Sequence, residues 1–331
     1  MSRPPSETGE MTMWQPIGGR LVALAALFLA TAIVGLSPAV ADPQGSRWGA
    51  DYFPNVPLVT QDGQTVHFYE DLLKGKAVAI NLIYTHCKDA CPLETARLVQ
   101  VQRLLGDRVG REIFFYSISI DPARDTPAVL KAYTKKFHVG PGWLFLTGKK
   151  ADIDLLSKKL GLSSRTDADS PDGHQTSLML GHEPTGQWMR HSAEDNSRFL
   201  AVAIENLLGK SRQPRKSYAE ARPLTVDEGQ HLFQMRCAAC HSIGKGDGVG
   251  PDLLGVTRRR DRTWLTRMIA TPDTLLAEGD PLATTLFNTY KQVRMPNLGL
   301  TEAQVGLLIE YLEAQGATRQ RPESRDSVIA Q

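Results

Sequence analysis

The sequence predicts two domains of different class: an α/β sandwich over residues 50–208, followed by an all-α domain over residues 225–315. Two observations predict this division. Runs typical of buried strands alternate with runs of helical periodicity in the first domain, whereas the second shows helical periodicity alone. Between them, residues 209–224 are basic, contain prolines and carry few apolar side chains, a composition typical of an exposed linker.

In the first domain, strands and helices are predicted in a regular order. The strands are predicted at 77–84, 113–120 and 143–146, and the helices at 93–105, 125–137 and 153–160. The second of these helices opens with a capping residue and Pro127 in its first turn. A hairpin around Pro184-Thr185-Gly186 and a final helix at 196–208 follow. This order fits a thioredoxin-like sandwich.

The second domain is predicted to be helical throughout. Its helices are expected at 226–235, 263–270, 281–293 and 301–314. Thr301 and Gln304 form the pattern of a capping box at the start of the last helix. The polar tail at 316–331 is outside the predicted fold, and the two domains share no internal repeat.

The N-terminus indicates an exported protein. Arg20 precedes an apolar run at 21–36, and Ala39-Val40-Ala41 has the small-residue pattern of a cleavage site. The run is shorter than the roughly 20 residues that a membrane span needs. We therefore expect residues 1–41 to be a signal peptide and the mature protein to be periplasmic; a retained membrane anchor is the alternative. The net charge of +2 gives no reason to expect a nucleic-acid partner.

Two short motifs contain all four cysteines, and the second is a CxxCH at residues 237–241. A c-type haem needs two thiols that form thioethers with the porphyrin vinyl groups, and an adjacent histidine as an axial ligand. Zinc would need two further His or Cys ligands, and neither type occurs after His241. The motif therefore predicts one covalent haem c on Cys237, Cys240 and His241.

The second axial ligand is predicted to be Met295, in a loop just before the last helix. A His/Met pair raises the haem potential and suits electron transfer. The rival, Met268, lies in an apolar helical run where core packing is its expected role.

Residues 225–314 resemble a class I cytochrome c. The resemblance rests on the CxxCH motif, on residues 250–253 (Gly-Pro-Asp-Leu) and on residues 294–296 (Arg-Met-Pro). It implies that Pro251 helps to orient the haem histidine, and that Gly229 and Tyr311 lie where the first and last helices touch.

The first cysteine motif is a CxxxC, in which Cys87 and Cys91 lie where a strand ends and a helix begins. At positions i and i+4 they share a helical face once the turn is wound, and a helix N-terminus favours thiolates. Two thiolates offer a soft site that suits Cu(I). A redox dithiol could use the same spacing, so both chemistries remain open from the spacing alone.

The surrounding residues resemble the SCO/SenC family, which are thioredoxin-fold copper proteins linked to cytochrome oxidase assembly. The resemblance covers residues 50–208 and rests on three stretches, 52–58, 84–92 and 119–127. It implies a third copper ligand, His174, from a position where the family has an Asp-His pair. Here Gly173 replaces that aspartate, which alters copper affinity if the aspartate orients the histidine.

Two further residues near the motif have open roles. His86 adjoins Cys87 and could shift its pKa or serve as a spare ligand, although a structural role is the simpler interpretation. Asp121 follows the second strand, and the resemblance implies a role around the copper ligands, against simple turn capping.

Together these features predict a copper-binding redox protein that assembles or maintains a respiratory copper centre, with a cytochrome oxidase subunit as the expected partner. The haem would exchange electrons with the Cys87, Cys91 and His174 site. We expect a metallochaperone or electron-transfer protein more than a turnover enzyme. One alternative is a thiol-disulfide oxidoreductase in which Cys87 and Cys91 cycle with haem as electron partner. Another is an electron carrier whose α/β domain only docks partners.

Overall fold

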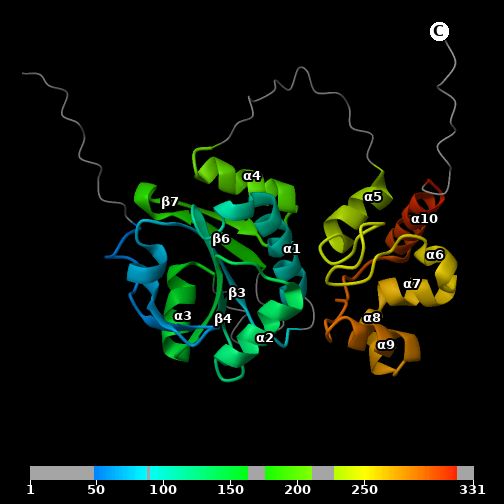
Figure 1. Cartoon of the computed structure of the whole chain (residues 1–331), viewed down its shortest axis with the longest axis horizontal. Helices are drawn as coiled ribbons and strands as arrows, with labels where there is room; N and C mark the ends of the chain where they lie inside the picture. The colour runs from blue at the N-terminus through cyan, green and yellow to red at the C-terminus, as the bar shows by residue number, and fades with distance from the viewer. Residues whose placement is uncertain (1–47, 88–89, 163–175, 211–226, 319–331) are drawn as a thin grey trace, which may run out of the picture. The chain divides into compact units, whose positions relative to one another are not determined.

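The structure is a computed structural model that describes residues 48–87, 90–162, 176–210 and 227–318 (Figure 1). These ranges contain an α/β domain and an all-α domain, so the predicted fold class is confirmed. Within them, no helix combines the length and apolar character needed to cross a bilayer. The predicted signal peptide, most of the predicted linker and tail, and His174 with Gly173 lie outside the described residues.

The α/β domain is built on a seven-stranded mixed sheet with the order β2-β1-β5-β4-β3-β6-β7. The central strands β3, β4 and β5 are parallel, and the outer pairings are antiparallel. The strands are β1 (Pro57–Thr60), β2 (Thr65–His67), β3 (Ala77–Ile83), β4 (Ile113–Ser119), β5 (Trp143–Gly148), β6 (Ser177–His182) and β7 (Gln187–Ser192). Helical crossovers join the parallel strands, as parallel pairing requires.

Helices cover both faces of this sheet (Figure 1). They are α1 (Ala90–Leu105), α2 (Pro127–Phe137), α3 (Lys150–Lys159) and α4 (Ser197–Leu207), with a π-helical turn at Phe68–Leu73. Alternate residues of β3 face opposite layers: Ala79 packs with α1, α2 and α4, whereas Ile80 packs with α3 and the π-helical turn. All seven residues of β3 are buried, which explains why six of them are apolar; the seventh is Asn81.

The predicted helices and strands of this domain are all present, with shifted ends. The helix that follows Cys87 begins at Ala90 rather than after Pro92, because proline is tolerated in a first helical turn. Thr126 caps α2 by accepting a hydrogen bond from the backbone N–H of Val129. The β1–β2 hairpin was not predicted, since β1 and β2 are short and partly polar.

The register between β3 and β4 positions the first cysteine motif. The two parallel strands pair from Ala77 with Ile113 to Ile83 with Ser119. Both therefore end at the same edge of the sheet, and the residues that follow them meet there. Cys87 follows β3 at this edge, and the connection from β4 to α2 lies beside it.

The all-α domain contains the predicted helices and two short ones, α6 and α8, that were not predicted. Its helices are α5 (Glu228–Leu232), a π-helical turn (Phe233–Cys237), α6 (Val256–Arg259), α7 (Arg262–Ala270), α8 (Pro272–Ala277), α9 (Pro281–Thr289) and α10 (Glu302–Thr318). The predicted capping box of α10 is confirmed: the Thr301 N–H donates to Gln304 Oε1 (3.0 Å), and the Gln304 N–H donates to Thr301 Oγ1 (3.3 Å).

The first and last helices of the all-α domain pack at Gly229. A Cβ added there would lie 2.5 Å from the Leu307 carbonyl oxygen and 2.8 Å from Tyr311 Cβ. The aromatic rings of Phe233 and Tyr311 lie 5.6 Å apart at the same contact. The predicted meeting of Gly229 and Tyr311 is therefore confirmed, and it requires a residue without a side chain.

Candidate functional site

Cys87 and Cys91 lie at the start of α1. The backbone N–H of Cys91 donates to Cys87 Sγ over 3.4 Å, so the first turn of the helix holds the Cys87 sulfur beside Cys91. The side chains are 8% and 0% exposed, respectively, which leaves Cys87 as the one nearer to solvent. All four cysteines of the chain are among the described residues, and none of them is in a disulfide. Two sulfur donors on adjacent backbone turns fit a soft metal ion.

The helix N-terminus acts on the two thiols unequally. Cys87 receives the N–H of the first turn, whereas burial raises the pKa of Cys91 well above its ordinary value, and the neighbouring Cys87 adds to this shift. The expectation that the helix N-terminus favours thiolates is therefore wrong for Cys91, because burial outweighs it. Cys91 is a neutral thiol in the folded protein, and a bound metal would have to displace its proton.

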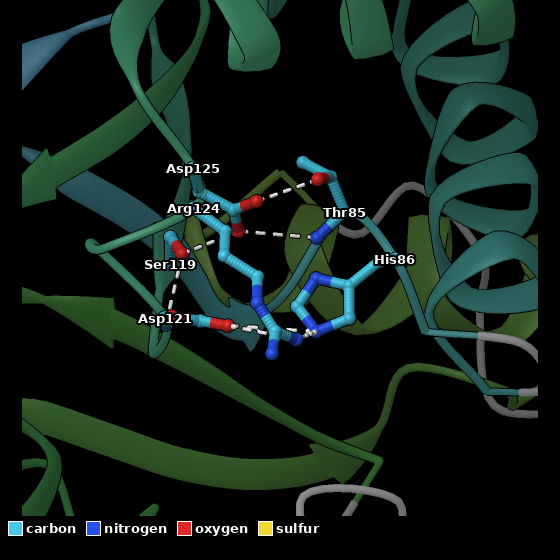
Figure 2. A network of polar contacts seen from close by, with 6 residues as sticks. All are labelled: Thr85, His86, Ser119, Asp121, Arg124 and Asp125. Carbon is cyan, nitrogen blue, oxygen red and sulfur yellow. Dashed lines mark hydrogen bonds and ion pairs between the residues drawn. The ribbon is translucent and has the colours of Figure 1, made fainter.

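A polar network lies just before Cys87, at the edge where β3 and β4 end (Figure 2). Asp125 is fully buried at the end of the β4–α2 connection. Its carboxylate accepts hydrogen bonds from the Thr85 N–H (3.1 Å), from Thr85 Oγ1 (2.5 Å) and from Ser119 Oγ (2.6 Å). These bonds tie the chain two residues before Cys87 to the neighbouring connection.

His86 contacts the same connection through its ring. Arg124 Nη1 lies 2.8 Å from His86 Nε2, and Asp121 Oδ2 lies 3.4 Å from that nitrogen (Figure 2). A guanidinium can only donate, so Nε2 accepts and its lone pair is engaged. In this arrangement Nε2 of His86 is not presented as a copper ligand. Asp121 faces His86 through its side chain, and its backbone N–H donates a hydrogen bond to Ser119 Oγ (3.1 Å).

A buried chain of hydrogen bonds runs from Trp143 to Glu94, which lies one turn after Cys91 on α1. Trp143 Nε1 donates to Ser117 Oγ (2.9 Å), Ser117 Oγ donates to Asn81 Oδ1 (2.7 Å), and Asn81 Nδ2 donates to Glu94 Oε2 (3.2 Å). An indole N–H only donates, so the direction of the chain is fixed. Burial raises the pKa of Glu94 well above its usual range, which favours the neutral acid.

The third predicted copper ligand cannot be placed. His174 and Gly173 belong to residues 163–175, which the structure does not describe. Within the part of the chain that is described, no group of three or more His, Cys, Asp or Glu side chains is arranged to hold a metal ion. The assignment of Cys87, Cys91 and His174 as copper ligands therefore stays a prediction.

In the all-α domain, the CxxCH motif lines a cavity of ≈ 280 Å³. Cys237, Cys240, His241 and Met295 all border it, together with apolar side chains such as Phe233, Ile269 and Leu312. Burial raises the pKa of both Cys237 and Cys240 to about 12, which disfavours thiolate ligation. The cavity therefore fits a covalently attached haem.

His241 is oriented by its second ring nitrogen. Nδ1 donates to the Pro251 carbonyl oxygen over 2.9 Å, which leaves Nε2 as the nitrogen that can bind iron. This agrees with the role that the resemblance implies for Pro251. A Cβ at Gly250 would lie 2.8 Å from His241 Cε1, so glycine gives the ring its space.

Asp252 fixes the loop that carries Pro251. Its carboxylate accepts hydrogen bonds from the N–H groups of Gly244 (2.8 Å), Gly246 (2.7 Å) and Leu254 (2.8 Å), and from Ser242 Oγ (2.8 Å). Burial alone would raise the pKa of Asp252, but these hydrogen bonds outweigh it and hold the pKa well below its usual range.

Met268 and Met295 both border the haem cavity. Met268 lies within α7, whereas Met295 lies in the segment between α9 and α10. Because both methionines line the cavity, the lining does not distinguish which one would bind the iron. Met295 as the second axial ligand therefore stays a prediction.

Three residues near these sites were not singled out from sequence for their roles. Glu94 could have been noticed as an acidic residue one turn after Cys91 on the buried face of α1. Asp125 was interpreted only as part of a helix start, and Gly250 only as part of a motif. Their partners lie elsewhere in the chain, at Asn81, Thr85 and His241.

Comparison with known proteins places both domains in families. Residues 46–208 match the family model SCO1/SenC, and residues 226–315 match the family model Cytochrome c. A SCO2-like protein of Rickettsia felis is 32% identical over 148 residues, which are 42% of this chain and 68% of that protein.

Two further matches have related names. A putative copper-binding protein of Stutzerimonas stutzeri is 33% identical over 134 residues, which are 38% of this chain and 62% of that protein. A SCO1/SenC family lipoprotein of Bacillus anthracis str. Ames has a solved structure that is 26% identical, covers 49% of this chain and 98% of that one, and gives a TM-score of 0.41.

Proposed function

Because the chain belongs to the SCO1/SenC family and a cytochrome c domain follows in its sequence, we propose that it supplies copper to a respiratory copper centre or maintains the thiols of that centre. Cys87 and Cys91 would bind the copper ion together with His174, and a subunit of the cytochrome oxidase type would receive it. The haem would exchange electrons with this site.

The observation that carries the proposal is the pair of sulfur atoms at the start of α1. Cys87 Sγ lies 3.4 Å from the Cys91 backbone nitrogen, so the sulfur of Cys87, just before α1, lies beside the first turn of the helix that contains Cys91. Two thiolates favour Cu(I), and an imidazole extends the site to the harder Cu(II) ion. A site that holds both oxidation states suits a protein that accepts, reduces and passes on copper.

The haem is proposed as the electron partner because it is part of the same chain. About 15 residues join the two predicted domains, so the copper site and the haem belong to one molecule. Tethering two sites through a short connection typically gives an effective concentration in the millimolar range. Reduction of Cu(II) to Cu(I) takes one electron, and oxidation of the haem iron from Fe(II) to Fe(III) supplies one.

Adding Cu(II) to protein with reduced haem is therefore expected to oxidise the haem at a rate that does not depend on protein concentration. The reason is that electron transfer within one tethered molecule is a unimolecular step. Stopped-flow absorbance of the haem at several protein concentrations measures this rate. Cys87→Ser should abolish the fast phase, because copper would no longer be bound to the molecule that carries the haem.

The alternatives give different outcomes in the same experiment. A rate that rises with protein concentration would show that the two domains act as separate carriers. Haem oxidation by a disulfide substrate in copper-free protein would favour a thiol-disulfide oxidoreductase. A fast phase unchanged in Cys87→Ser would favour an electron carrier whose α/β domain only docks partners.

Replacing Met295 with alanine is expected to lower the haem potential and open the sixth coordination position, because thioether ligation favours Fe(II). Redox titration and absorbance of the reduced and oxidised protein measure both changes. Met268→Ala is the matched control, since Met268 borders the same cavity. If Met268→Ala changes the potential and spectrum while Met295→Ala does not, the ligand assignment is reversed.

We also propose that the protein is exported to the periplasm. Its support is the sequence of residues 1–41, with an apolar run followed by a small-residue cleavage pattern. Export would place the dithiol and the haem in the compartment where respiratory copper centres are exposed. N-terminal sequencing of protein from the periplasmic fraction would show whether cleavage follows Ala41.

A further inference from the structure

Asp125 is the only fully buried acidic residue in the β4–α2 connection, residues 120–126, and its carboxylate bonds to Ser119 and to Thr85, two residues before Cys87. Burying a carboxylate is costly unless hydrogen bonds replace its water shell. Asp125 receives three such bonds, two from Thr85 and one from Ser119. Figure 2 shows the carboxylate between Thr85 and Ser119. Because these hydrogen bonds offset the cost of burying Asp125, we ask which residue they hold in place.

Thr85 is the residue that Asp125 fixes, and it is fixed at two points. Its backbone N–H and its hydroxyl both bond to the Asp125 carboxylate, over 3.1 Å and 2.5 Å. The backbone and the side chain of Thr85 therefore cannot rotate independently. Only His86 separates Thr85 from Cys87, and the His86 ring contacts Arg124 of the same connection. The direction in which the chain leaves β3 toward Cys87 is set by these contacts.

The two sulfur ligands are positioned by different parts of the fold. Cys91 lies within α1 and moves with that helix. Cys87 lies before α1, on the segment that follows β3, and its placement depends on how that segment is anchored. The separation and angle of the two sulfur atoms therefore depend on the anchor at Thr85 as well as on the helix.

We propose that Asp125 is a positioning residue for the copper site, acting through Thr85 on the placement of Cys87. This inference rests on the proposed copper function. Outer contacts that orient a metal ligand typically change metal affinity 10- to 100-fold when they are removed. Asp125 makes a comparable contact, but its hydrogen bonds go to Thr85, two residues before the ligand Cys87, and not to Cys87 itself.

The test compares four variants of the full-length, haem-loaded protein. Asp125→Ala removes all three hydrogen bonds. In Asp125→Asn, the amide oxygen can still accept from the Thr85 N–H and from Ser119 Oγ. The amide NH₂ group then faces the Thr85 hydroxyl, whose oxygen can accept a hydrogen bond from it. Thr85→Val removes only the hydroxyl bond and keeps the backbone bond. Thr126→Ala removes the neighbouring N-cap of α2 and leaves the Asp125 bonds intact.

The measurements are Cu(I) affinity by competition with a chromophoric chelator, the Cu(II)–thiolate charge-transfer absorption, and the midpoint of thermal unfolding. We expect Asp125→Ala to weaken Cu(I) binding about 10- to 100-fold and to shift the absorption band. Thr85→Val should give a smaller loss, and Asp125→Asn should remain within a few-fold of wild type. Thr126→Ala should lower the unfolding midpoint without changing the affinity or the band.

The outcomes separate this inference from the proposed function. If wild-type protein binds no copper at Cys87 and Cys91, the proposed function fails before Asp125 is tested. If wild type binds copper, but Asp125→Ala and Thr85→Val leave both affinity and absorption unchanged, the positioning role is wrong. An equal change in Thr126→Ala would also overturn it, since stability alone would then account for the effect. If Asp125→Ala does not fold, Thr85→Val still decides the question.

Discussion

Replacing Cys91 with serine is expected to lower the Cu(I) affinity of the full-length protein by more than about 100-fold. This loss is larger than the roughly 10- to 100-fold typical of removing a residue that only orients a metal ligand. A serine oxygen is a harder and weaker donor for Cu(I) than a thiolate, and a site of three ligands loses one of its two sulfur atoms. Chelator competition on the reduced protein measures the affinity. Cys87→Ser should give a loss of the same order.

The matched control is His86→Ala. His86 adjoins Cys87 but its Nε2 accepts from Arg124 Nη1 at 2.8 Å, so its removal should change the affinity only a few-fold. A large loss in His86→Ala with little change in Cys91→Ser would show that copper binds at a different set of donors. Retained affinity in both cysteine variants would remove the basis for copper handling at this site.

Replacing Gly229 with valine is expected to unfold the all-α domain or lower its stability by about 3 kcal/mol or more, at the upper end of overpacking costs. The added Cβ would lie 2.5 Å from the Leu307 carbonyl oxygen and 2.8 Å from Tyr311 Cβ. Both are parts of α10 that cannot move aside without separating the two helices. Thermal unfolding followed by haem absorbance measures the loss.

Gly306→Ala is the matched control for this prediction. Gly306 also lies in α10, but nothing is within 4 Å of the position where its Cβ would stand. Alanine is favoured over glycine inside a helix by about 0.5–1 kcal/mol, so this variant should be as stable as wild type or slightly more stable. Equal loss in both variants would show that any side chain in this region is disruptive, and that the Gly229 contact is not special.

The parts of the molecule that could be predicted from sequence are those that contiguous residues specify. Cys87 with Cys91, and Cys237 with Cys240 and His241, are each complete within five residues, so spacing alone suggests their chemistry. The capping box of Thr301 and Gln304 is equally local. The parallel direction of β3, β4 and β5 follows from alternating strands and helices, because parallel strands need crossovers.

The parts that could not be predicted depend on register between distant segments. Asp125 reaches Thr85 only because β3 and β4 end at the same edge, and 40 residues separate the two in the chain. Glu94 similarly reaches Asn81 on β3 from α1. The short strand β1 left no sequence signal, since only four residues form it and half of them are not fully buried. Local periodicity does not contain this information.

The contact at Gly229 also bears on how such a chain could have arisen. Because α5 and α10 pack against each other, the first and last helices of the all-α domain complete the same part of its core. The fold closes on itself, so a polypeptide can be joined before α5 without opening any of its internal packing. A unit of this kind can be copied from one gene and appended to another as a whole. The two family matches, which cover residues 46–208 and 226–315 without overlap, are the pattern that such a gene fusion leaves.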